Sequence, residues 1–203
     1  MVNIKKFVAG PIKTNVYVIY DLKKRGALID PGFPNQEIRD FINKEKIDVV
    51  YILITHGHFD HVCDAKELRA QTGAVIAMAE NDLAMAGHSH NWVGRQMGYE
   101  LKNFSPDLFL KEGQIIKVGE IEIKVLATPG HSPGGSCFYL EKEKILFSGD
   151  TLFASAVGRT DLPFANEEEI WKSIREKLFV LPDDTRVLPG HGKETTIGQE
   201  KII

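Results

Sequence analysis

Apolar residues along the chain form short runs separated by polar turns, a pattern typical of a sheet-rich protein with a few helices. Alternating or continuous apolar runs predict strands near residues 2–8, 15–20, 26–30, 48–54, 75–78, 114–118, 121–127, 135–140, 144–148 and 186–188. Apolar residues at helical spacing predict helices near 35–45, 61–72, 167–179 and 194–200. The order favours an α/β fold in which two sheets pack together and helices lie outside.

The helix near 167–179 has the clearest start signal. Asn166 stands at the N-cap position and Glu169 follows three residues later, which is the spacing of a capping box. We therefore expect the two residues to satisfy each other's backbone N–H groups at the start of this helix.

The segment from Thr55 to His61 (Thr-His-Gly-His-Phe-Asp-His) follows the strand predicted over 48–54 and contains three histidines and an aspartate. Imidazole and carboxylate are the donors that zinc, iron and manganese accept. Such a group cannot be buried together without a cation or extensive hydrogen bonding. The segment therefore predicts a metal site at the end of a buried strand.

Three further candidate ligands each sit in a turn with a neighbouring glycine, after an apolar run: His131, Asp150 and His191. Glycine allows a positive φ and a close approach of the backbone to a ligand. Five histidines and two aspartates exceed the four ligands of one structural zinc, but they suit two metals that share a carboxylate. Capped loop residues or a surface histidine cluster are the alternative, which the placement of all seven after strands disfavours.

The H-x-H-x-D-H segment, followed by a distant His, an Asp and a final His, resembles the metallo-β-lactamase-fold hydrolases over nearly the whole chain. The resemblance implies a single domain over residues 1–203 with a four-layer αβ/βα sandwich. It implies that Asp150 bridges two metals, and the presence of Asp there argues against a β-lactamase of the class with Cys at this place. The other ligands it implies are His56, His58 and His131 for the first metal, and Asp60, His61 and His191 for the second.

Within that superfamily the sequence is most similar to glyoxalase II (hydroxyacylglutathione hydrolase) and its short relatives. The similarity lies in three stretches: Ile29-Asp30-Pro31-Gly32, residues 128–134 (Thr-Pro-Gly-His-Ser-Pro-Gly) and residues 148–153 (Ser-Gly-Asp-Thr-Leu-Phe). Full-length glyoxalase II adds a helical C-terminal segment that this sequence does not contain, so a short relative is expected. The resemblance implies hydrolysis of a thioester such as S-lactoylglutathione.

The run Gly158-Arg159-Thr160-Asp161 resembles both those short relatives and the persulfide dioxygenases, which share the fold but use a single iron. In that alternative, first-set histidines such as His56 and His58 would bind ferrous iron together with His131 and Asp150. Hydrolysis of another ester, a phosphodiester or a lactone is also compatible, because loops select the substrate on a common fold.

Two divalent cations can lower the pKa of a shared water towards ~7 and so supply hydroxide at neutral pH. Zinc is the first expectation for both, with iron or manganese as alternatives. Asp60 is expected to be the catalytic residue that orients the attacking hydroxide. Arg159 falls where glyoxalase II has a basic residue for the substrate carboxylate, and its alternative is a salt bridge with Asp161.

Residues beside the ligands are expected to support them. Asp30 follows a strand and precedes Pro-Gly, so it is expected to form a turn and to brace the metal loop. Thr55 and Thr128 have hydroxyls next to ligands and are expected to hold metal-bound histidines, whose second N–H is usually fixed by an acceptor. For His88 and His90 we expect a loop that borders the cleft or faces solvent.

Composition and charge limit the kinds of partner that the protein is expected to bind. The 203 residues are 43% apolar and have a net charge of −3, and no Lys/Arg run exceeds three residues, which disfavours nucleic acid and anionic membranes. No signal peptide or membrane helix is evident. The two cysteines, Cys63 and Cys137, suit free thiols in a reducing cytoplasm. The expectation is a cytoplasmic enzyme with a small-molecule substrate, in an oligomeric state that the sequence leaves open.

Overall fold

The computed structural model describes residues 1–86, 94, 96 and 105–202, and two six-stranded sheets form its centre. The first sheet has the strand order β1 (Asn3–Ala9), β2 (Thr14–Tyr20), β3 (Arg25–Ile29), β4 (Asp48–Leu53), β5 (Val75–Ala79) and β6 (Leu108–Leu110). The second has the order β14 (Thr195–Thr196), β13 (Arg186–Pro189), β10 (Ile145–Gly149), β9 (Ser136–Leu140), β8 (Ile121–Ala127) and β7 (Ile115–Val118). Both sheets are mixed: β3 to β6 run parallel, as do β10 and β13, whereas the other pairs are antiparallel.

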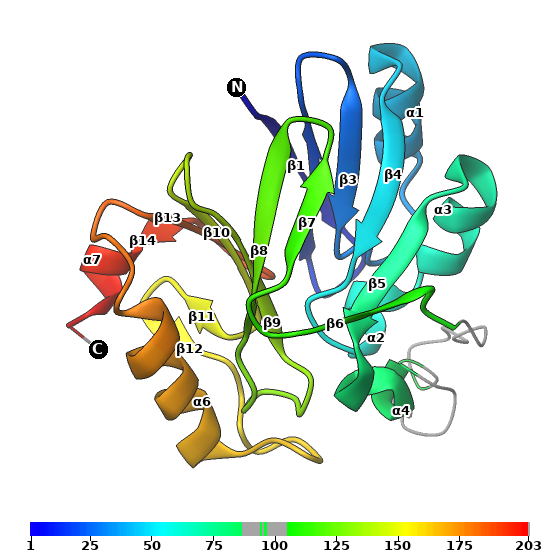
Figure 1. The fold of residues 1–203 in the computed structure, drawn as a ribbon. Helices are drawn as coiled ribbons and strands as arrows, with labels where there is room; N and C mark the ends of the chain where they lie inside the picture. The colour runs from blue at the N-terminus through cyan, green and yellow to red at the C-terminus, as the bar shows by residue number, and fades with distance from the viewer. Residues whose placement is uncertain (87–93, 95, 97–104, 203) are drawn as a thin grey trace.

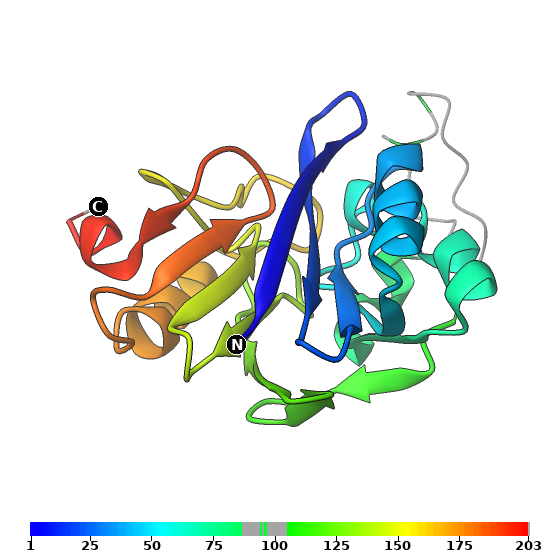
Figure 2. The same ribbon diagram turned by 90° about the horizontal axis from the view of Figure 1, so that it is seen from above.

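Helices cover the outer face of each sheet, as Figures 1 and 2 show. Helices α1 (Gln36–Glu45) and α3 (Ala65–Thr72) lie beside the first sheet, and α6 (Glu167–Ser173) and α7 (Ile197–Glu200) lie beside the second. The predicted αβ/βα sandwich is therefore confirmed. In the described part of the chain, no helix combines the length and the apolar character that crossing a membrane requires.

Three apolar clusters correspond to the three spaces between these four layers. Side chains such as Ile19 and Phe138 form the cluster between the sheets. A second cluster joins the first sheet to α1 and α3 through residues such as Ile38 and Leu68, and a third joins the second sheet to α6 through Ile170. Strands buried on both faces explain why β2, β9 and β10 are nearly continuous apolar runs rather than alternating ones.

Most predicted elements are confirmed, and the differences occur at short or interrupted segments. The helix predicted over 61–72 is two helices, α2 (Phe59–Val62) and α3, because the chain turns at Asp64, the residue before α3. The helix predicted over 194–200 begins as strand β14, whose backbone pairs with β13, and only its last four residues are helical. The helix predicted over 167–179 continues beyond α6 as a π-helical turn over Ile174–Leu178.

Besides β14, five short elements of the described residues were not predicted from the sequence. Helix α4 (Leu83–Ala86) follows a 3₁₀ turn over Glu80–Asp82, and β11 (Leu152–Phe153) pairs with β12 (Ala156–Val157) in a two-stranded sheet. The remaining one is the edge strand β6. Elements of two to four residues contain too few positions to show a period.

The capping-box prediction for Asn166 is only half correct. Its side chain accepts a hydrogen bond from the N–H of Glu169 at 3.1 Å, as an N-cap residue should. Its own N–H, however, donates to the carbonyl of Gly130 at 2.7 Å rather than to the Glu169 side chain. The start of α6 is thereby attached to the turn that carries His131.

Polar side chains of β2 connect the first sheet to the end of β13 in the second. The Asn15 side-chain amide donates to the carbonyls of Pro189 at 2.9 Å and Gly192 at 3.0 Å. The Tyr17 hydroxyl donates to the Pro189 carbonyl at 2.8 Å. Because these groups are buried or partly buried, they fix how the segment after β13 lies against the first sheet.

We predict that Tyr17→Phe lowers the free energy of unfolding by about 1 kcal/mol, because one buried hydrogen bond is lost while Asn15 still donates to the same carbonyl. Urea unfolding measures the change. Tyr20→Phe, which removes a hydroxyl from the same strand at a partly exposed position, should change the free energy by less than about 0.5 kcal/mol. Equal effects of the two variants would contradict this role of the Tyr17 hydroxyl.

Candidate metal centre

All seven candidate ligands follow strands whose ends meet at one edge of the two sheets. Strand β4 of the first sheet leads into the segment from His56 to His61, which includes the short helix α2. In the second sheet, the chain leaves β8, β10 and β13 towards the same edge, because β10 and β13 are parallel and β8 is two antiparallel steps away from β10. These three strands precede His131, Asp150 and His191, respectively.

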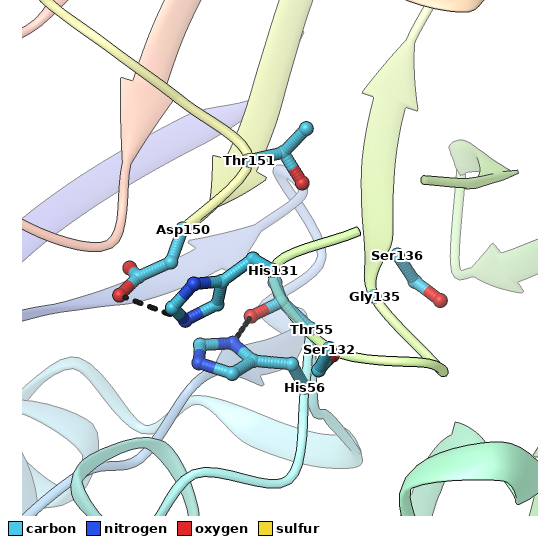
Figure 3. A pocket seen from close by; sticks show the side chains of 8 residues that line it. All are labelled: Thr55, His56, His131, Ser132, Gly135, Ser136, Asp150 and Thr151. Atoms are coloured by element: carbon cyan, nitrogen blue, oxygen red, sulfur yellow. Dashed lines mark hydrogen bonds and ion pairs between the residues drawn. The ribbon is translucent and has the colours of Figure 1, made fainter. Parts of the chain in front are cut away.

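The ligand atoms fall into overlapping groups. In each group one donor atom from every residue lies within 4.8 Å of the others, and the three groups are His56, His58 and His131; His56, His61 and Asp150; and Asp60, His61 and His191. The first and third groups are the two metal sets that the sequence motif implied. The second group places Asp150 against a histidine from each of them, and Figure 3 shows its carboxylate facing His131 beside His56.

Three of the histidines are held through Nδ1, which directs Nε2 to the centre of the cluster. Nδ1 of His61 lies 2.9 Å from the Asp30 carboxylate, and Nδ1 of His131 lies 2.9 Å from the carbonyl oxygen of Arg159. The Thr55 hydroxyl donates its one hydrogen to Asp30 and therefore accepts from Nδ1 of His56 at 3.0 Å. Each acceptor fixes the tautomer in which Nε2 has a free lone pair.

Several buried polar atoms at the centre have no hydrogen-bond partner among the described residues. They are Nε2 of His56, Nε2 of His61 and Oδ1 of Asp150. In addition, Nδ1 of His58 lies 2.9 Å from Nε2 of His131, so one proton or one cation between them would satisfy both nitrogens. Buried polar atoms normally have partners, and a cation is the partner that neighbouring lone pairs of imidazole and carboxylate would share. The residues therefore fit divalent metal ions.

The charges of the site favour neutral histidines in one half. Burial, together with the neighbouring His61, holds the pKa of His56 well below its ordinary value. Burial and the neighbouring His131 lower the pKa of His58 to about 3. Neutral imidazole is the form that binds metal.

In the other half the carboxylates favour positive charge. Burial alone would lower the pKa of His61, but Asp60, Asp150 and Asp30 outweigh it and raise the pKa well above its ordinary value. Burial would also lower the pKa of His191, but the hydrogen bond with Asp60 and the charges of Asp150 and Asp60 together outweigh it and raise the pKa. A site that stabilises a proton on buried imidazoles also stabilises a bound cation, because the carboxylates attract either charge.

The Asp30 carboxylate accepts more hydrogen bonds than a simple turn would require. Its Oδ1 accepts from the N–H of Thr55 at 2.7 Å, and its Oδ2 accepts from the Thr55 hydroxyl at 2.7 Å and from His61. Asp30 itself has φ of 50°, which is uncommon outside glycine and places the carboxylate under the metal loop. It thus contacts one ligand directly and a second through Thr55.

Among the described residues the Thr128 hydroxyl forms no hydrogen bond with a histidine, which differs from the contact expected for it. Its hydroxyl lies 3.0 Å from the Thr151 hydroxyl and 3.3 Å from the Cys137 sulfur. It follows β8 immediately and therefore packs against the neighbouring strand β9, while the Arg159 carbonyl holds His131 instead. Thr128 supports the turn that carries Asp150 through Thr151.

Arg159 forms an exposed salt bridge with Asp161, which is the alternative weighed for it. Its Nε and Nη2 lie 2.9 and 2.8 Å from the two carboxylate oxygens of Asp161. The side chains are 67% and 70% exposed, so solvent and a substrate anion can both compete for the guanidinium. His88 and His90 lie outside the described residues.

Two supporting residues were missed from the sequence. The buried Thr14 hydroxyl donates to Oδ2 of Asp60 at 3.0 Å, and a polar residue at the start of an apolar strand is the signal that could have revealed it. The buried Asp82 accepts hydrogen bonds from Gly57, Ser132 and Gly134, which belong to the two loops that carry the first ligand set. Its surroundings in the sequence, Glu80-Asn81-Asp82, resemble an ordinary polar turn.

The sequence matches the family model described as the metallo-beta-lactamase superfamily over residues 9–191. Among curated relatives, the probable metallo-hydrolase YqgX of Bacillus subtilis is 33% identical over 198 residues, which are 97% of this chain and 93% of that protein. The hydroxyacylglutathione hydrolase GloC of Haemophilus influenzae is 35% identical over 201 residues, with coverages of 98% and 95%.

Solved structures agree with this assignment. The BLEG-1 B3 metallo-beta-lactamase has a TM-score of 0.92 and 34% identity, covering 99% of this chain and 97% of that one. TTHA1623 in a di-iron-bound form has a TM-score of 0.87 and 33% identity, with coverages of 97% and 96%. ETHE1 from Myxococcus xanthus has a TM-score of 0.80 and 28% identity, with coverages of 98% and 81%. With its fold and its clustered histidines and aspartates, this chain belongs to the metallo-beta-lactamase superfamily.

Proposed function

We propose that the protein is a binuclear metal-dependent hydrolase that cleaves a thioester such as S-lactoylglutathione to a hydroxy acid and a free thiol. The observation that carries the proposal is the pair of three-residue ligand sets with Asp150 between them, at whose centre buried atoms have no hydrogen-bond partner in the described part of the chain. The likeness to GloC, which is named a hydroxyacylglutathione hydrolase, supports the substrate class. The proposed metals are two divalent ions per chain, with zinc first and iron or manganese as alternatives.

The residues divide into two metal sets. His56, His58 and His131 would hold one cation, and Asp60, His61 and His191 the other. Asp150 lies between them, with Oδ1 at 3.5 Å from Nε2 of His61 in the second set and Oδ2 at 3.7 Å from Nε2 of His131 in the first. When bound, two divalent cations activate water for attack at neutral pH and polarise the substrate carbonyl.

The protein's own groups then determine how water and substrate are oriented. Thr14 holds Oδ2 of Asp60, so we propose that the other oxygen of this carboxylate accepts a hydrogen bond from the attacking water. The departing thiolate is a good leaving group and needs no general acid. Arg159 would bind the carboxylate of the substrate after exchanging its contact with Asp161.

A persulfide dioxygenase is the second candidate. The likeness to ETHE1 and the shared Gly158-Arg159-Thr160-Asp161 run favour it, since this run also occurs in the persulfide dioxygenases. That enzyme would use a single iron. The two candidates therefore differ in metal stoichiometry as well as in reaction.

We predict two divalent metal ions per chain and release of free thiol from S-lactoylglutathione, lost on chelation and restored by Zn²⁺. Elemental analysis of protein purified without added metal, combined with a thiol assay, measures both. One iron per chain with persulfide-dependent oxygen uptake and no thiol release would replace the hydrolase by the dioxygenase. A β-lactam belongs among the assayed substrates because of the likeness to BLEG-1, and faster turnover of it would reject the thioester.

We predict that Asp30→Asn weakens metal binding about 10- to 100-fold, because an amide has one acceptor oxygen and cannot serve the Thr55 N–H on one side and the Thr55 hydroxyl and His61 on the other. Calorimetric titration of metal-free protein with Zn²⁺ measures the affinity. Asp21→Asn alters another buried aspartate, in the turn between β2 and β3, and should leave the affinity unchanged. Unaltered affinity in Asp30→Asn would remove Asp30 from the supporting role.

We predict that Arg159→Ala raises KM for S-lactoylglutathione about tenfold with little change in kcat, because a charge-assisted contact made equally in the ground and transition states is lost. Asp161→Asn should not raise KM, since it frees the guanidinium from its salt bridge. Steady-state kinetics of both variants distinguish the two. An unchanged KM in Arg159→Ala would leave Arg159 with only its salt bridge to Asp161.

A further inference from the structure

Asp82 joins the two chain segments that carry the first ligand set. It is fully buried and ends the 3₁₀ turn that follows β5. Its Oδ2 accepts from the N–H of Gly57 at 2.8 Å and from the hydroxyl of Ser132 at 2.6 Å, and its Oδ1 accepts from the N–H of Gly134. One carboxylate therefore spans two loops that come from different sheets.

The donors to Asp82 lie next to the ligands of one set only. Gly57 stands between His56 and His58, and Ser132 follows His131 directly. None of the three donors is adjacent in the chain to Asp60, His61 or His191. A change at Asp82 would therefore act first on the cation held by His56, His58 and His131.

The packing around Asp82 is tight from both sides. A Cβ atom added to Gly57 would lie 2.6 Å from the backbone oxygen of Asp82, and one added to Gly134 would lie 2.8 Å from the Asp82 carboxylate. Both distances are shorter than real Cβ atoms tolerate, so the approach of Asp82 requires glycine at these two positions. The two loops are thus packed against the residue that also bonds them.

We propose that Asp82 is a positioning residue that fixes the distance between the His56–His58 segment and His131, and so sets the affinity of the first ligand set for its cation. The inference rests on the binuclear site of the proposed function but is independent of which substrate that site cleaves. Among the described residues, Asp82 forms no hydrogen bond with a candidate ligand, and it acts through Gly57, Ser132 and Gly134.

A neutral amide cannot replace this carboxylate. Burial raises the pKa of Asp82, while the three hydrogen bonds favour its ionised form. Asparagine of the same shape has one acceptor oxygen, so its NH₂ group would face the N–H of Gly134 or the donors from Gly57 and Ser132. At least one of the three hydrogen bonds is then lost in Asp82→Asn, which weakens the link between the two loops.

The chain contains a matched control at Asp21, which is also buried. Its Oδ1 accepts from the N–H groups of Lys23 at 2.8 Å and Arg25 at 3.0 Å, and its Oδ2 accepts from the N–H of Glu120 at 3.0 Å. The pattern of two donors on one oxygen and one on the other is the same as at Asp82. Asp21 lies where β4 begins, whereas the ligands follow its end, because Arg25 of β3 pairs with Asp48.

The test is calorimetric titration of metal-free wild type, Asp82→Asn and Asp21→Asn with Zn²⁺, with urea unfolding to compare their stability. We expect wild type to bind two zinc ions. Asp82→Asn should bind one as tightly as wild type and the other about 10- to 100-fold more weakly. Asp21→Asn should keep both affinities although it loses a similar number of hydrogen bonds.

Ser132→Ala keeps the carboxylate and removes one donor, so it serves if Asp82→Asn does not fold. It should weaken binding of the same zinc ion by a smaller factor. Three results would each overturn the proposal. They are wild-type zinc affinities in Asp82→Asn, an equal loss of affinity for both zinc ions in Asp82→Asn, and the same selective loss of one affinity in Asp21→Asn. Failure of the proposed function appears in wild type alone, as a missing second zinc or missing thiol release, whereas failure of this inference appears only in the comparison of variants.

Discussion

The hydrogen bonds of the buried Asp30 carboxylate are the interaction on which the order of the metal centre depends. They fix Nδ1 of His61 directly and Nδ1 of His56 through the Thr55 hydroxyl. With Nδ1 occupied, each ring directs its second nitrogen to the centre, where no described group accepts or donates to it. Burying such lone pairs without a cation costs free energy, so the arrangement that stiffens the loop also favours metal binding.

The centre forms only when the two sheets have packed, because each sheet supplies part of each ligand set. His131 from the second sheet completes the set of His56 and His58, and His191 completes that of Asp60 and His61. Hydrogen bonds cross the same boundary: Thr14 holds Asp60, and Asn15 holds the carbonyls beside His191. Packing of the apolar faces and assembly of the site are therefore one event, and metal binding should stabilise the sandwich as a whole.

The sequence predicted the two-sheet architecture and the residues that converge, because long apolar runs and ligand-rich turns leave local signals. What it could not predict depends on pairing between distant segments. Residues 195–196 form strand β14 because β13 lies beside them. The N–H of Asn166 donates to the Gly130 carbonyl and is therefore not available to the Glu169 side chain. The contact expected for Thr128 was missed for the same reason, because proximity in sequence to His131 does not decide which group its hydroxyl contacts. Asp82 has no local signal at all, since its three donors come from two remote loops.

The segment at Arg159 shows how one fold can keep its metal chemistry while changing substrate. Its backbone carbonyl holds Nδ1 of His131, a contact that any residue type provides. Among the described residues, its exposed side chain is paired with Asp161 alone, so replacing it would alter the proposed recognition of an anion without moving the histidine. Substrate preference can therefore diverge here at little structural cost, as relatives of one fold with different named activities require. By the same logic, a substitution that shifts the carbonyl rather than the side chain should act on the metal first and on the substrate second.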